Sequence, residues 1–174
     1  TVKTVNGKKP VFFGLDAKND FYAKNIKNSG DGKVLATLCF DNNNIDVEIP
    51  AIGTYMVTNA LAAAAAGNLL GLTDEEIANG VASYQTVGSR ANVINTGKIK
   101  IIDDCYNANP TSVRASLDTL SNLDGRKVAI LGDMKELGSE ELKLHFDTGV
   151  YAKSKDIGTV ITVGELAKEL AKGA

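Results

Sequence analysis

The stretch of residues 101–120, read as IIDDCYNANPTSVRASLDTL, constrains the fold more than any other part of the chain. A β-branched run leads into Asp103 and Asp104, which is typical of a strand that ends in a polar turn. Asn109 can cap a following helix, and Pro110 suits its first position, where no amide hydrogen is needed. Three apolar residues at i, i+4 and i+7 form one face of that helix: Val113, Leu117 and Leu120. We expect the acids at the carboxyl end of the strand, where α/β proteins bind ligands, although an ordinary capped turn fits the same residues.

The first third of the chain predicts short strands. Residues 11–13 form one candidate, and residues 34–40 form a clearer one. Residues 45–49 alternate apolar and polar side chains, as a strand with one buried face does. Residues 41–44, one aspartate and three asparagines, have the composition of a turn. We therefore expect a β-hairpin around this turn.

Two helices should follow the hairpin and pack against each other. Residues 54–70 contain a run of alanines, which are strong helix formers and small enough for neighbouring elements to approach closely. Gly71 ends this helix, and Thr73 with Glu76 forms a capping box for the next one. The inner face of the second helix is predicted to hold three residues: Ile77, Val81 and Tyr84.

The second half of the chain alternates strands and helices. The predicted strands cover residues 91–95, 98–102, 127–131 and 159–163, with a turn at Thr96 and Gly97. Ser139 should cap a helix that continues to about Lys153, and residues 165–171 form another helix. The inward residues of the first of these helices are predicted as Leu142, Phe146 and Val150. Such alternation indicates an α/β fold with a mostly parallel sheet and right-handed crossovers.

The predicted domain boundary lies within residues 85–92, read as QTVGSRAN. Gly88 and Ser89 interrupt the helical pattern, and no periodicity continues across them. We therefore divide the chain into residues 1–87 and residues 88–174. The first residues already resemble a strand and turn without an initiator methionine, and the last residues stop after a helix. The sequence is accordingly expected to be a piece of a longer enzyme.

Composition excludes several classes of protein. The net charge is -2 and 44% of residues are hydrophobic, so nothing indicates a nucleic-acid or membrane-surface footprint. No apolar run approaches the ~20 residues of a membrane span, and no signal peptide is evident. The single histidine, His145, excludes a multi-histidine metal site. The two cysteines, Cys39 and Cys105, lie far apart in the sequence, which favours a reduced, cytoplasmic setting.

Three motifs resemble the Mur ligase family of peptidoglycan synthesis. They are NALAAAAAG at residues 59–67, DDCYNANPTS at residues 103–112 and GDMKELG at residues 132–138, and they stand in the family's order. The resemblance covers most of the chain from about residue 34. The YNANP and GDMKELG motifs are most similar to those of the member that joins D-alanyl-D-alanine to UDP-N-acetylmuramoyl-tripeptide. It implies the end of a central ATPase domain followed by a Rossmann-like C-terminal domain.

The resemblance implies a nucleotide site built from four residues. Asn59 would hydrogen-bond the adenine of ATP, because an amide both donates and accepts. Arg90 would reach the γ-phosphate and offset the charge that develops during phosphoryl transfer. Asp104 would accept from the ribose hydroxyls, with Asp103 as the alternative, and the Tyr106 ring would lie near the adenine. Each has a structural alternative. Asn59 also fits a surface helical asparagine, and Arg90 also fits a solvated arginine. Asp104 also fits a residue that only stabilises the turn, and Tyr106 one that packs in the core.

Further residues are weaker candidates for contact with the substrate. Asn107 and Asn109 are turn and cap residues that can also reach a ligand. The loop of residues 132–138 would face the incoming amino substrate, and its polar side chains belong to Asp133, Lys135 and Glu136. His145 is interpreted as a surface or half-buried helical residue. Cys105 is interpreted as structural, because no base that could activate it is evident.

The chain contains no G-x-x-x-x-G-K-[ST] phosphate loop. In the family this loop, the acids that bind Mg²⁺ and a modified lysine lie in earlier sequence. The resemblance therefore implies ATP and Mg²⁺ as cofactors of a longer enzyme, no metal ligand among these residues, and an inactive chain when tested alone. It also implies that the enzyme is a cytoplasmic monomer that acts in cell-wall formation, cell shape and cell division.

Two other interpretations remain open. One is a different ligase of the superfamily, of the folylpolyglutamate or cyanophycin type. The YNANP and GDMKELG motifs argue against this interpretation. The other is a stand-alone, non-catalytic, Rossmann-like binding module. A phosphate loop encoded upstream in the same reading frame would exclude the binding module.

Overall fold

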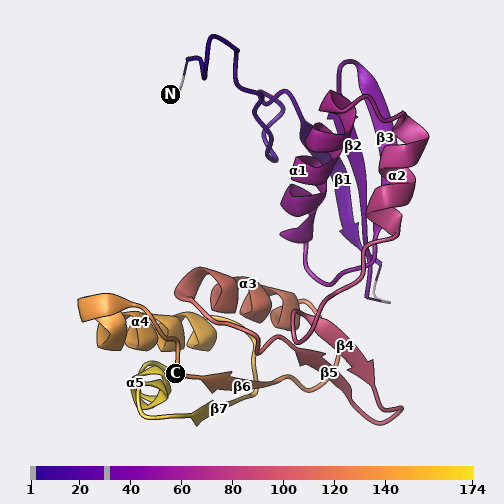
Figure 1. Cartoon of the computed structure of the whole chain (residues 1–174). Coiled ribbons are helices and arrows are strands. Elements are labelled where there is room, and N and C mark those ends of the chain that lie inside the picture. Colours follow the sequence, from indigo (N-terminus) through magenta and orange to yellow (C-terminus); the bar gives the residue numbers. More distant parts are fainter. Residues whose placement is uncertain (1–2, 30–31) are drawn as a thin grey trace. The chain divides into compact units, whose positions relative to one another are not determined.

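The computed structural model describes residues 3–29 and 32–174, and the chain divides into two units (Figure 1). The first unit is Thr1–Gln85 and the second is Thr86–Ala174. Each unit has its own strands and helices and is described separately. Together they form a mixed α/β structure. Within the described residues, no helix is both long and apolar enough to cross a membrane.

The first unit contains a three-stranded antiparallel sheet in the order β1-β2-β3, formed by Tyr22–Asn28, Val34–Phe40 and Asn43–Ile49. The predicted hairpin is confirmed, because β2 pairs with β3 and Phe40 lies opposite Asn43. The two residues between them, Asp41 and Asn42, have φ values of 46° and 65°. Aspartate and asparagine tolerate this left-handed backbone better than other residues with a Cβ, so the turn residues specify the hairpin.

The prediction for the first strand of this sheet was wrong. Residues 11–13 form no strand, and only an isolated bridge joins Phe13 to Phe21. The first strand is β1, which was not predicted. Its register with β2 shifts between Lys24 and Lys27, and Asn25 in this irregular stretch has a φ of 55°. A bulge of this kind breaks the two-residue alternation by which strands are recognised.

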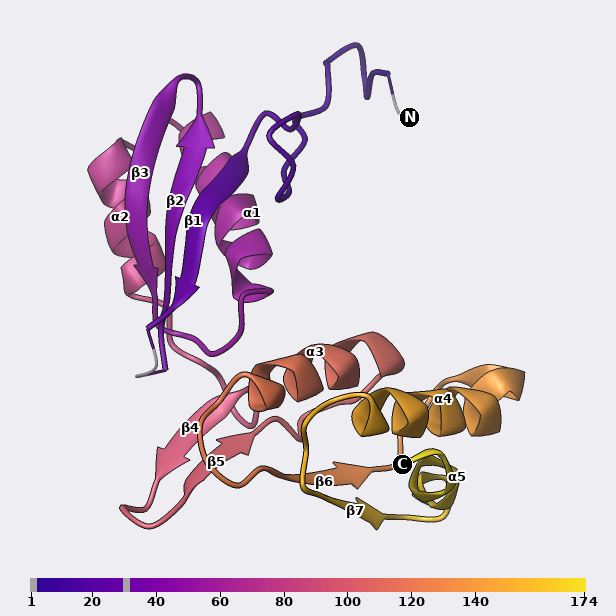
Figure 2. The same cartoon turned by 180° about the vertical axis from the view of Figure 1, so that it is seen from behind.

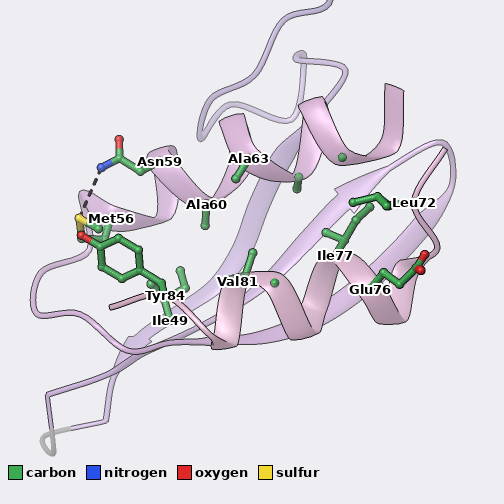
Figure 3. A pocket seen from close by; sticks show the side chains of 13 residues that line it. Ile49, Met56, Asn59, Ala60, Ala63, Leu72, Glu76, Ile77, Val81 and Tyr84 are labelled. Carbon is green, nitrogen blue, oxygen red and sulfur yellow. Dashed lines mark hydrogen bonds between the residues drawn. The ribbon is translucent and has the colours of Figure 1, made fainter. Parts of the chain in front are cut away.

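Two helices, α1 (Met56–Leu69) and α2 (Asp74–Ala82), lie across one side of this sheet, as Figure 3 shows. The predicted capping box at α2 is confirmed: Thr73 accepts from the amide of Glu76, and the Glu76 carboxylate accepts from the amide of Thr73. Gly71, at a φ of 87°, follows α1 as predicted. Tyr84 does not belong to the inner face, because it lies beyond the end of α2 and is 39% exposed.

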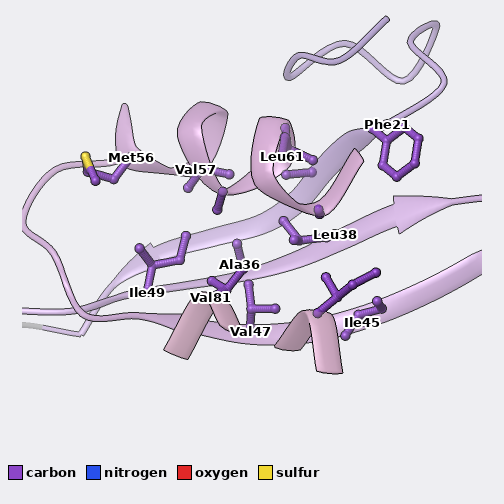
Figure 4. Packing of buried hydrophobic residues seen from close by; sticks show 14 of the residues in the cluster. Phe21, Ala36, Leu38, Ile45, Val47, Ile49, Met56, Val57, Leu61 and Val81 are labelled. Atoms are coloured by element: carbon purple, nitrogen blue, oxygen red, sulfur yellow. The ribbon is translucent and has the colours of Figure 1, made fainter. Parts of the chain in front are cut away.

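The core of the first unit forms between the sheet and both helices (Figure 4). Alternate residues of β2 and β3 supply one side, and α1 and α2 supply the other; the buried residues include Ala36, Leu38, Val47, Ile49, Val57, Leu61 and Val81. The rings of Phe21 and Phe40 stack with their centroids 4.7 Å apart. The small alanines of α1 let this helix approach the sheet closely, as the sequence predicted.

The second unit begins with an antiparallel hairpin, β4 (Asn92–Asn95) and β5 (Lys100–Asp103), and continues through α3 (Pro110–Ser121). A parallel pair follows, formed by β6 (Val128–Gly132) and β7 (Thr159–Val163). The short helix η1 (Gly138–Glu140) and α4 (Glu141–Lys153) connect these two strands, and α5 (Ala167–Gly173) follows them. Figure 2 shows α3 and α4 on the same side of the parallel pair. The core of this unit is centred on Leu117, Ala129 and Ala152.

The start of α3 agrees with the sequence. Asn109 accepts a hydrogen bond from the Ser112 amide at 2.9 Å and is the predicted cap, with Pro110 in the first turn. Leu117 is buried, and Val113 and Leu120 pack against the same cluster. Local sequence features therefore predicted the start of this helix correctly.

Three predictions about α4 were wrong. One of them is that His145 lies at the surface or half-buried, whereas its exposed fraction is 0%. Ser139 does not cap it, because η1 precedes the helix and its N-cap residue, Glu140, makes no side-chain cap hydrogen bond. The expected inner face is exposed, with exposed fractions of 41–53% for Leu142, Phe146 and Val150. The face that packs inward instead holds His145, Thr148, Gly149 and Ala152. Three of these residues, Thr148, Gly149 and Ala152, are small, and α5 lies so close that a Cβ at Gly149 would meet its backbone.

Candidate functional site

Asp104, immediately after β5, ties together two parts of the second unit. Its Oδ1 accepts from the amide of Ala91 at 2.9 Å, and its Oδ2 accepts from the hydroxyl of Ser116 on α3 at 2.6 Å. Ala91 has a φ of 51°, which is an unfavourable backbone for alanine. The carboxylate therefore stabilises a strained turn that leads into β4, and both of its oxygens have partners within the unit.

Arg90 and Tyr106 lie against each other beside this turn. The guanidinium carbon of Arg90 is 3.9 Å from the centre of the Tyr106 ring, and the Tyr106 amide donates to the carbonyl of Ser89 at 3.0 Å. Tyr106 is nevertheless 65% exposed. A cation over an exposed ring contributes roughly 0.5–1 kcal/mol, so a ligand with a flat ring or an anionic group can compete for either side chain. The structure thus brings together three predicted site residues, Arg90, Asp104 and Tyr106.

Asp103 and Cys105 form a smaller group at the same turn. The Cys105 thiol donates to Asp103 Oδ1 at 2.9 Å. Hydrogen bonds from Cys105 and then from Ser89 lower the pKa of Asp103, whereas the nearby Asp103 carboxylate raises the pKa of Cys105. The thiol is therefore held in its protonated form, which is a poor nucleophile. This geometry agrees with a structural role for Cys105.

The two asparagines of this segment make local hydrogen bonds. Asn107 accepts from the amide of Ala108 at 2.9 Å, and Asn109 caps α3. Asn107 and Asn109 are both exposed. Each side-chain oxygen already accepts one hydrogen bond from the backbone, and the amide nitrogens remain as donors.

The loop of residues 132–138 follows β6 and presents its polar side chains in two directions. Asp133 accepts from the amide of Ala167 at the start of α5 at 2.8 Å, and it pairs with Lys135 at 3.0 Å. These contacts, the Ala167 amide first, lower the pKa of Asp133. Lys135 and Glu136 are exposed, and Glu136 has a φ of 62°. Asp133 therefore anchors the loop, whereas Lys135 and Glu136 lie on its outer side.

Asn59 belongs to the first unit and lies at the edge of an apolar groove between α1 and α2 (Figure 3). The groove has a volume of about 380 Å³, and its lining includes Met56, Ile77 and Val81. The Asn59 amide nitrogen is 3.4 Å from the sulfur of Met56, which is a weak acceptor. The Asn59 side chain is exposed and retains polar capacity for a ligand.

Sequence reasoning missed the residues that hold the site in place. Ser116 carries no motif, because its role depends on α3 folding back over the end of β5. Ala91 looks like an ordinary strand residue until its positive φ is known. The only sequence signal was the position of Ser116 one residue before Leu117, which places it at the edge of the buried face of α3.

Both units match sequence models of known domains. Residues 2–67 match the Mur ligase middle domain, and residues 89–174 match the Mur ligase, glutamate ligase domain. Among curated proteins, the chain is 34% identical over 165 residues to the UDP-N-acetylmuramoyl-tripeptide--D-alanyl-D-alanine ligase of Bacillus subtilis. This match covers 93% of the chain and 35% of the relative, so the chain spans about a third of the length of that protein.

Solved structures give the same relationship. A crystal structure of MurF from Acinetobacter baumannii matches with a TM-score of 0.90 at 32% identity, covering 96% of this chain and 36% of that one. A crystal structure of MurF ligase from Thermotoga maritima in complex with ADP matches with a TM-score of 0.81 at 27% identity, covering 94% of this chain and 38% of that one. Since the two domain models cover most of both units and the structural matches cover nearly the whole chain, the chain belongs to the Mur ligase family.

Proposed function

We propose that this chain is part of an ATP-dependent ligase that joins D-alanyl-D-alanine to UDP-N-acetylmuramoyl-tripeptide in peptidoglycan precursor synthesis. The observation that carries the proposal is the 34% identity, over 93% of the chain, to a relative that bears this activity in its name. The MurF ligase of Thermotoga maritima binds ADP in its crystal structure, which supports an adenine nucleotide as ligand. We also propose that the enzyme is cytoplasmic and monomeric and that it serves cell shape and cell division.

In the proposed reaction, ATP transfers its γ-phosphoryl group to the peptide carboxylate and leaves as ADP, and the amine of the dipeptide then attacks the acyl phosphate and loses a proton. Phosphate then leaves from the tetrahedral intermediate. Asn59 and Tyr106 would bind the adenine, Asp104 the ribose, and Arg90 the transferring phosphoryl group. Mg²⁺ would neutralise phosphate charge. The described residues contain no group of three His, Cys, Asp or Glu side chains that could hold a metal ion.

The test uses the intact protein that carries this chain. Phosphate release from ATP should require both D-alanyl-D-alanine and UDP-N-acetylmuramoyl-tripeptide, and the 174-residue chain alone should release none, because it has no phosphate loop. A folate together with glutamate, in place of the UDP-tripeptide and the dipeptide, should not support release. Activity with those substrates would instead indicate another ligase of the superfamily.

Residues 1–87 would be the C-terminal part of the central ATP-binding domain, and residues 88–174 the first part of the C-terminal domain. Limited proteolysis should first cut the chain within residues 85–92, where Val87 is 77% exposed and no helix or strand protects the backbone of residues 85–91. Mass spectrometry of the early fragments identifies the site. First cleavage inside either group of strands and helices, with residues 85–92 intact, would argue against this division.

Loss of the Tyr106 ring or of the Asp104 charge should weaken ATP binding more than it slows the chemical step. Neither side chain would touch the reacting phosphate, so Tyr106→Ala and Asp104→Asn should each raise KM for ATP by about tenfold with a smaller change in kcat. Steady-state kinetics of the intact enzyme gives both values.

Ser116→Ala is the matched control for this experiment. It removes the hydroxyl that donates to Asp104 and leaves the carboxylate in place. This variant should lower the melting temperature and raise KM for ATP less than Asp104→Asn does. If Asp104→Asn behaves in the same way as Ser116→Ala, Asp104 serves only to hold the turn at Ala91.

A further inference from the structure

His145 on α4 is fully buried, and both of its ring nitrogens have backbone partners. Its exposed fraction is 0%. Nε2 accepts a hydrogen bond from the amide of Met134 at 2.9 Å, and Nδ1 lies 2.7 Å from the carbonyl of Glu141. A neutral imidazole donates at one nitrogen and accepts at the other. Since Nε2 accepts, the proton belongs on Nδ1, where it is donated to Glu141 in the preceding turn of the same helix.

The bond to Met134 fixes the middle of the loop of residues 132–138. Met134 is 1% exposed, so its buried amide needs a hydrogen-bond acceptor, and the imidazole provides it. The two positive φ values of the loop, 62° at Glu136 and 67° at Gly138, follow this point directly. The imidazole therefore sets where the loop begins to turn outward.

A second anchor holds the start of the same loop. Asp133 accepts from the amide of Ala167, and a Cβ at Gly164 would lie 2.2 Å from the Asp133 carboxylate. Gly164 thus leaves room for this carboxylate beside the turn between β7 and α5. With Asp133 and Met134 both anchored, Lys135 and Glu136 lie on the exposed side of the loop, where the Lys135 ammonium pairs with Asp133 at 3.0 Å.

We infer that His145 is a positioning residue that fixes the loop at Met134 and so orients Lys135 and Glu136 toward the incoming amine substrate. The role of the loop in binding the amine depends on the proposed function; the fixing of the loop by His145 does not. The imidazole reaches no substrate itself, because it is buried and both nitrogens are used.

The first test measures the loop without any reaction. In hydrogen exchange of the 174-residue chain followed by NMR, the Met134 amide should be protected. His145→Leu should accelerate its exchange by about tenfold relative to the amides of β6. His145→Gln, which can place an oxygen near the position of Nε2, should restore part of the protection. Thr148→Val is the control, because Thr148 is equally buried on α4 but bonds only Leu144 within the helix.

Unchanged exchange at Met134 in His145→Leu, or equal acceleration of every amide in the second unit, would overturn the positioning role. If His145→Leu does not fold, the position of the imidazole proton in the wild-type protein provides the test instead. Long-range proton–nitrogen correlations should show the proton on Nδ1, and a proton on Nε2 would contradict the inference.

The second test uses the intact enzyme. His145→Leu should raise KM for D-alanyl-D-alanine by about tenfold and leave KM for ATP unchanged, and His145→Gln should recover part of this loss. An unchanged KM for the dipeptide, despite faster exchange at Met134, would remove the loop from the amine site. If the wild-type enzyme does not use the dipeptide at all, the proposed function fails, while the exchange experiment still decides whether His145 holds the loop.

Discussion

Replacing Gly149 with alanine should destabilise the second unit by about 2–3 kcal/mol. Gly149 lies in the middle of α4, where a Cβ would be 2.0 Å from the carbonyl oxygen of Leu170 and 2.9 Å from its carbonyl carbon. These are backbone atoms of α5, so no side-chain rotation relieves the clash. The two helices would have to separate, and the buried contacts of Leu170 and Ala167 with the rest of the unit would loosen. Urea unfolding followed by amide signals of the second unit measures the loss.

Gly80→Ala is the matched control for this prediction. Gly80 also lies inside a helix, α2, but a Cβ there would meet nothing within 4 Å. Alanine is the better helix former by about 1 kcal/mol, so this substitution should stabilise the first unit slightly. If both substitutions stabilise their units, the close contact between α4 and α5 does not constrain Gly149.

Replacing Arg90 with alanine in the intact enzyme should lower kcat by about 10²–10³, because loss of one group that stabilises the charge of a transition state costs roughly 3–4 kcal/mol. Arg90 is exposed and stacks on Tyr106, and no carboxylate within the described residues forms an ion pair with it, so its charge is available to a phosphoryl group. Arg90→Lys should recover only part of the rate, since an ammonium cannot form the paired hydrogen bonds of a guanidinium.

Arg114→Ala provides the comparison for Arg90. Arg114 also lies over a tyrosine ring, 5.2 Å from the centre of Tyr151, but it belongs to α3 and its ring partner is not one of the predicted site residues. Its removal takes away the same charge and a similar ring contact, so kcat should stay within about twofold of wild type if the role of Arg90 is specific. Equal losses of kcat in the two variants would mean that Arg90 acts only through general charge or stability.

Local sequence rules predicted the segments in which short-range contacts dominate. The hairpin between β2 and β3 depends on the left-handed backbone at Asp41 and Asn42, and the start of α3 depends on Asn109 and Pro110. The capping box at Thr73 and Glu76 likewise involves residues three positions apart. Such contacts are present in the sequence itself, so pattern and propensity identify them.

The same rules failed where contacts with segments distant in the sequence determine the structure. The strand β1 was missed because its bulge at Asn25 disrupts the alternation, and its place at the edge of the sheet depends on β2. The inner face of α4 was assigned to Leu142, Phe146 and Val150 because they are large and apolar. The inward face instead holds His145 and three small residues, since α5 approaches too closely at Gly149 for any side chain there.

For the candidate site, the sequence alone determined which residue types are present and in what order: two acids after a strand, a tyrosine, a capped helix and the GDMKELG loop. Only the tertiary structure decided what each side chain contacts. It placed Arg90 over Tyr106, joined Asp104 to Ala91 and Ser116, and buried His145 beneath the loop at Met134. The physical reason is that a buried hydrogen bond needs a partner from whichever segment folding brings near, and spacing along the chain does not specify that segment.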